Sequence, residues 1–150
     1  MKKTIIVAIF FILLGALSGR FLYYKLEGVE TTFSNQDVYY FLQEGVYSNE
    51  DIMNENTKKL NSKLITSSDN KYYVYLGITK NLDNAKKIEK LYEDKGYDIY
   101  LKELSFSNEE FSTNVEQFDK LIESTNDLDD ILTIEEVVLS NYEEIMRKDK

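Results

Sequence analysis

The chain has 150 residues, a net charge of −9 and neither histidine nor cysteine. Without these two residue types it has no imidazole general base, thiolate nucleophile, histidine or cysteine zinc site, or disulfide bond. An enzyme would have to work with carboxylate, lysine, tyrosine or serine side chains alone. We therefore predict a protein that is not an enzyme and has no catalytic residue, cofactor or metal site. A hydrolase that uses only carboxylates is the enzymatic alternative.

The N-terminal segment, residues 1–26, is predicted to be a cytoplasmic start and a membrane anchor. Its apolar run from Thr4 to Leu22 is about 28 Å long as a helix, close to the hydrocarbon thickness of a bilayer. The lysines before this run favour a cytoplasmic N-terminus, which places the bulk of the chain outside a cell membrane that it crosses once. A cleaved signal peptide is the alternative, because Ala16-Leu17-Ser18 is a small-residue cleavage pattern. Residues 27–36 are predicted to be a linker.

Residues 37–104 contain two similar passages about 32 residues apart, in which an aromatic strand runs into a glycine and then into an asparagine that can cap a helix. This repeat predicts an α+β fold, a ferredoxin/ribonucleoprotein-like sandwich (β-α-β repeated) with helices on one sheet face. The expected elements are strand 38–47, helix 48–64, a short strand around Ile65-Thr66, strand 71–78, helix 81–95 and strand 97–104.

Side-chain alternation along the strands assigns the aliphatic residues to a core and leaves an aromatic platform with one amide on the open face. Aromatic rings of this kind pack against the apolar faces of sugar rings, while the amide can hydrogen-bond their substituents. The alternative is that these tyrosines are ordinary strand residues, solvated or covered by the C-terminal tail. The platform consists of Phe41, Gln43, Tyr73, Tyr75 and Tyr100.

The repeated passages also resemble a known family. Gln43-Glu44-Gly45-Val46-Tyr47-Ser48-Asn49 precedes a helix, and Tyr73-Val74-Tyr75-Leu76-Gly77 is followed by a helix that contains Ala85 and stops at Gly96. This order and spacing is similar to the SPOR domain (sporulation-related repeat) over residues 37–104. The resemblance implies a module that binds peptidoglycan glycan strands stripped of stem peptides, often in membrane-anchored division or sporulation proteins.

Within this resemblance, Gln43 matches the glutamine that the family places on its glycan-facing surface. Tyr72 falls where an aromatic residue often begins the second strand, and Tyr73 departs from the basic residue common at its position. The predicted glycan-binding residues are therefore Phe41, Gln43, Tyr72, Tyr73, Tyr75 and Tyr100.

The tail, residues 105–150, is predicted to be helical and acidic. Its 13 acids and 4 bases account for the whole net charge of the chain, which argues against a nucleic-acid partner. Two apolar stripes predict two helices, with capping boxes at Ser107-x-x-Glu110 and Thr133-x-x-Glu136. These helices could pack on the domain, pair with each other or dock on a partner protein. The stripes are Phe111, Val115, Phe118, Leu121 and Ile122, and Ile131, Ile134, Val138, Tyr142 and Ile145.

Adjacent acids in the tail are interpreted as solvated helix faces, since neighbours on a helix point about 100° apart and do not converge on a cation. These acids are Asp129-Asp130, Glu135-Glu136 and Glu143-Glu144.

The sequence thus supports two functional hypotheses. The first is a membrane-anchored, extracytoplasmic SPOR-like module that binds peptidoglycan glycan strands in cell division or sporulation. The alternative is a protein–protein docking subunit of a membrane or division complex, with no glycan binding. The position of the tail helices discriminates between them, because a tail that lies across the aromatic platform favours docking.

Overall fold

The computed structural model describes residues 5, 8, 9, 12 and 36–148. The predicted anchor and linker lie outside the described residues, except for positions 5, 8, 9, 12 and 36. Among the residues described, no helix has both the length and the apolar character needed to cross a bilayer.

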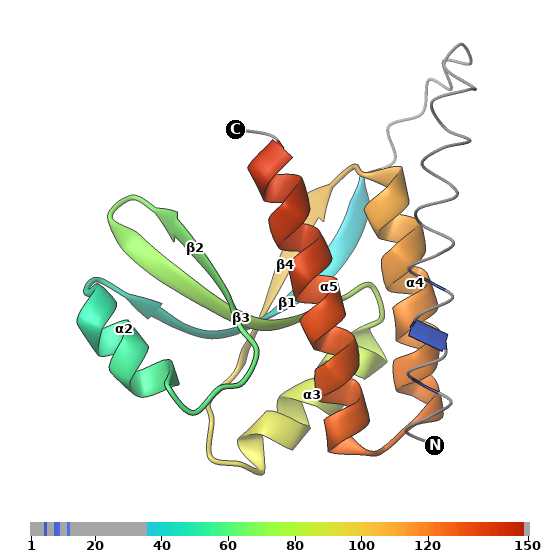
Figure 1. The fold of residues 1–150 in the computed structure, drawn as a ribbon, viewed down its shortest axis with the longest axis horizontal. Helices are drawn as coiled ribbons and strands as arrows, with labels where there is room; N and C mark the ends of the chain where they lie inside the picture. The colour runs from blue at the N-terminus through green and yellow to red at the C-terminus, as the bar shows by residue number, and fades with distance from the viewer. Residues whose placement is uncertain (1–4, 6–7, 10–11, 13–35, 149–150) are drawn as a thin grey trace.

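Four antiparallel strands form one sheet in the order β2-β3-β1-β4, and helices lie on both of its faces (Figure 1). This arrangement confirms the predicted α+β class. The elements are β1 Asp37–Tyr47, α2 Glu50–Thr57, β2 Leu64–Ser68, β3 Lys71–Thr79, α3 Leu82–Glu93, β4 Tyr100–Phe106, α4 Glu109–Ser124 and α5 Leu128–Lys148.

The two asparagines predicted as helix caps do cap helices. Asn49 accepts a hydrogen bond from the backbone N–H of Ile52, and Asn81 accepts from those of Asp83 and Asn84. The helix after Asn49 ends at Thr57, earlier than expected, because it buries only Met53 and Thr57 and so has little apolar surface to prolong it. Part of the segment that follows this shorter helix forms the short extra strand, β2, as predicted.

Both predicted capping boxes of the tail were wrong by position. Asn108, not Ser107, caps α4, since its side chain accepts from the backbone N–H of Phe111. Asp127 serves the first turn of α5, and Thr133 lies within that helix, where its hydroxyl donates to the Asp129 carbonyl. Asn108 directly precedes the first residue of α4, whereas Ser107 lies one residue too early and Thr133 lies inside α5, so neither is at the position that caps the free N–H groups.

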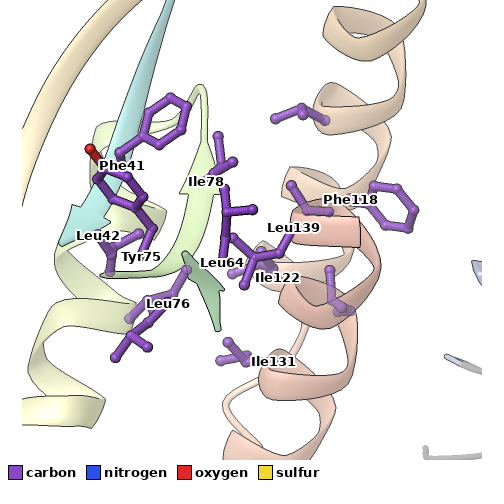
Figure 2. Close-up of a cluster of buried hydrophobic side chains, with 14 of the residues drawn as sticks. Phe41, Leu42, Leu64, Tyr75, Leu76, Ile78, Phe118, Ile122, Ile131 and Leu139 are labelled. Carbon is purple, nitrogen blue, oxygen red and sulfur yellow. The ribbon is translucent and has the colours of Figure 1, made fainter. Parts of the chain in front are cut away.

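The tail helices pack on each other and on the sheet, as part of the same hydrophobic core (Figures 1 and 2). Helix α3 packs against β1 and β3, and α5 crosses β3 on the other face of the sheet. The sequence left three possible arrangements for the tail helices. In the structure they both pack on the domain and pair with each other. The core residues labelled in Figure 2 come from β1, β2, β3, α4 and α5.

The pairing of β1 with β3 is interrupted by two bulges. The register passes over Leu76 on β3 and Glu44 on β1. An extra residue reverses the alternation beyond it, so the side chains of Tyr75 and Ile78 share a face although they are three residues apart. Strand β3 is consequently buried from Val74 to Thr79.

Candidate functional site

Five of the six predicted binding residues lie on one face of the sheet. The register pairs Gln43 with Tyr75 on one side and with Tyr100 on the other. The ring centroids of Phe41 and Tyr75 lie 5.3 Å apart. Tyr73 is two residues from Tyr75 on the same strand, so it faces the same way. The alternation in the sequence was therefore sufficient to bring Phe41, Gln43, Tyr73, Tyr75 and Tyr100 together.

Tyr72, the sixth residue, points to the opposite face. It pairs with Tyr47, and its hydroxyl lies 3.4 Å from Glu50 Oε2 at the start of α2. The structure therefore separates Tyr72 from the other five, and its role in fixing α2 on the sheet accounts for its position.

The tail covers one half of this face, which corrects the expectation of an open platform. Tyr142 of α5 lies against Phe41 with 5.2 Å between ring centroids. Phe41 and Tyr75 are only 1% and 5% exposed. The apolar stripe of α5 needs a partner surface, and this aromatic half of the sheet provides one. Phe41 and Tyr75 are therefore core residues.

The other half of the same face remains uncovered. Tyr100 is 63% exposed and Val46 is 44% exposed, while the neighbouring Gln43, Thr66 and Tyr73 are half-buried. Lys102, on β4, reaches across β1 and places Nζ 5.3 Å from the ring centroid of Tyr73 on β3. We call this surface the open strip; it consists of Gln43, Val46, Thr66, Lys71, Tyr73, Tyr100 and Lys102.

A second feature, missed by sequence reasoning, fastens the tail to the edge of β3. Strand β2 pairs with β3 only as far as Tyr75, so beyond that residue the edge of β3 that faces away from β1 has no strand partner. The N–H of Ile78 donates to Glu135 Oε2 at 2.8 Å, and the N–H of Lys80 donates to Asp119 Oδ2 at 2.9 Å. Side-chain carboxyl groups from α5 and α4 thus take the place of the missing strand.

The solvated-face interpretation of the acid pairs is therefore wrong at two positions. Glu135 is 1% exposed and Asp130 is 4% exposed. The signal that could have identified Glu135 is Gly77, a glycine inside a buried strand, which often marks a close approach. A Cβ at Gly77 would lie 2.8 Å from Glu135 Oε2.

Two of the buried carboxyl groups, Glu135 and Asp119, have a raised pKa. Burial raises the pKa of Glu135 well above its ordinary value of 4.5, the charge of Asp119 raises it further, and the Ile78 N–H opposes this rise. Burial also raises the pKa of Asp119, against hydrogen bonds from Thr79 and Asn84. Within the described part of the chain, no group of three or more acids is placed to hold a metal ion. The arrangement is suited to fixing the tail.

Comparison with known proteins identifies no relative of this chain. No protein-family model, curated protein or solved structure matches the chain. The geometry of the open strip is therefore the feature of the molecule that indicates a function.

Proposed function

We propose that this protein is a non-enzymatic, membrane-anchored, extracytoplasmic module that binds peptidoglycan glycan strands on the open strip, in cell division or sporulation. The β-α-β-β-α-β element order and the β2-β3-β1-β4 sheet support a ferredoxin/ribonucleoprotein-like sandwich, the type that the SPOR-like resemblance implies. The apolar run from Thr4 to Leu22 supports the anchor, with a cytoplasmic N-terminus.

The observation that carries the proposal is an accessible aromatic surface around one amide. The register places the Gln43 amide next to Tyr100, on the face where Tyr73 also lies. Neighbouring strands lie about 4.8 Å apart, so the strip spans about 10 Å from β3 to β4. Sugar rings can pack on the two phenol rings while the amide of Gln43 donates to and accepts from their hydroxyl groups.

The test is co-sedimentation of the full chain, in mild detergent, with purified cell-wall sacculi before and after amidase removes the stem peptides. We expect pelleting that increases after amidase treatment. The double variant Tyr73→Ala/Tyr100→Ala should bind about tenfold more weakly or worse, corresponding to about 1.4 kcal/mol. Ile52→Ala is the matched control, since Ile52 is 55% exposed on α2, outside the strip.

A second candidate is a docking subunit for another membrane or division protein. It is favoured by the position of α5, which covers Phe41 and Tyr75 and so removes half of the aromatic platform from solvent. A folded protein that does not pellet with either form of sacculi would contradict glycan binding and favour docking. A photo-crosslinking amino acid at Tyr100 would then capture a protein partner rather than glycan.

A further inference from the structure

The open strip differs in charge from the rest of the molecule. The chain has a net charge of −9, yet the strip contains Lys71 and Lys102 and no acidic residue. One acid, Asp37, occupies a strand position on this face, at its covered end, where Lys80 Nζ lies 3.0 Å from it. The strip is thus locally positive on an acidic protein.

Lys102 also controls access to the ring of Tyr73. Its Nζ lies 5.3 Å from the ring centroid, a cation–π contact that holds the ammonium group over the surface on which a sugar would stack. A neutral sugar that packs on this ring has to displace the ammonium group, and it provides no negative charge to replace the lost cation–π contact. A sugar that has a carboxylate can displace it and pair with it, so its packing on the ring and its ion pair occur together.

We infer that the open strip recognises a glycan by its free carboxylates, with Lys102 as the specificity-determining residue and Lys71 as a second cation on the same face. This inference rests on the proposed function and deepens it. In peptidoglycan the free carboxylate is that of a muramic acid residue whose stem peptide has been removed, whereas an attached stem peptide converts the same group to a neutral amide.

The experiment compares three probes on the full chain by isothermal titration calorimetry. These are stem-free glycan strands, the same strands with their carboxylates converted to neutral methylamides, and neutral oligomers of N-acetylglucosamine. We expect the wild type to bind the intact strands about tenfold more tightly than either neutral probe. This preference should weaken as salt increases, because the ion pair is exposed.

The variants identify the residue responsible. Lys102→Gln should lose the preference for intact strands while it binds the amidated strands as well as the wild type does. Lys86→Gln is the matched control, because Lys86 is exposed on α3 and the substitution changes the net charge equally. Retention of the preference in Lys102→Gln, or equal binding of all probes by the wild type, would overturn the carboxylate inference alone. Binding of none of the probes would overturn both it and the proposed function.

Discussion

The covered and open halves of one sheet face contain similar side chains but different environments. Phe41 and Tyr75 in the covered half are 1% and 5% exposed, whereas Tyr100 in the open half is 63% exposed. The halves are adjacent, since Gln43 of the open strip pairs with Tyr75. Their difference comes from the path of α5, which crosses one half of the face and leaves the other half uncovered (Figure 1).

This comparison shows that similar aromatic residues can serve stability in one place and binding in another. In the covered half the rings are removed from water and pack in the core, where each contributes through its buried apolar area. In the open half the Tyr100 ring is mostly in water, so it contributes little to folding and stays available to a ligand. Substitutions in the covered half should therefore lower stability, whereas substitutions in the open half should weaken ligand binding.

The largest effect is expected in the covered half. Phe41→Ala removes a ring that contacts both Tyr75 and Tyr142, and the cavity should lower the free energy of unfolding by about 3 to 5 kcal/mol. Urea denaturation followed by circular dichroism measures this change. A loss below about 1 kcal/mol would contradict the tail-covered arrangement, because such a loss is typical of an exposed ring.

A smaller loss is expected from Gly77→Ala at the tail-to-sheet contact. The new Cβ would lie 2.8 Å from Glu135 Oε2 and 3.1 Å from Leu42 Cδ1, which should destabilise the fold by about 1 to 3 kcal/mol. The same substitution in a Glu135→Ala background should cost less, because the closest neighbour is gone. Equal costs in both backgrounds would show that Glu135 does not occupy this position.

The pH dependence of stability tests the buried carboxyl group. The folded protein holds the Glu135 proton above pH 4.5, where the unfolded chain releases it, so this group lowers stability as pH rises towards its raised pKa. Glu135→Gln keeps an acceptor for the Ile78 N–H but cannot titrate. It should remove a slope of up to about 1.4 kcal/mol per pH unit in that window.

The control for this measurement is Glu136→Gln, the exposed neighbour on α5. It should leave the slope unchanged in urea denaturation series that run from pH 4.5 upwards. The same slope in the wild type and in Glu135→Gln would contradict a shifted proton affinity at Glu135.

The smallest effect is expected in the open half. Tyr100→Ala should change the free energy of unfolding by no more than about 0.5 kcal/mol, since its ring is mostly in water. The same variant should weaken glycan binding, measured by sacculus sedimentation. A large loss of stability would mean that the strip belongs to the core.

Local patterns were sufficient for much of the fold. The asparagines before α2 and α3 cap their helices, the strand alternation places Gln43, Tyr75 and Tyr100 on one face, and the extra strand β2 forms. These features depend on residues a few positions apart, so a single sequence contains the information. The bulge at Leu76 and the early end of α2 depend on packing partners that are distant in the chain.

The sequence predicts on which face of the sheet the candidate site residues lie, but it does not predict how exposed they are. Alternation gives the face of Phe41 and Tyr75, yet only the docking of α5 decides that they are buried. The same docking buries Glu135, which the sequence places on the surface, and its side chain accepts a hydrogen bond from the Ile78 N–H. Both outcomes join segments far apart in sequence, and no local period encodes which surface a helix will choose.

By itself the sequence determined the α+β class, the strand faces, the acidic helical tail and the absence of histidine and cysteine chemistry, because these follow from composition and short-range periodicity. The tertiary structure alone decided which half of the aromatic face is core and which is the open strip. The physical reason is that burial is a property of pairs of surfaces, and α5 buries its apolar stripe on the half of the sheet that it can reach.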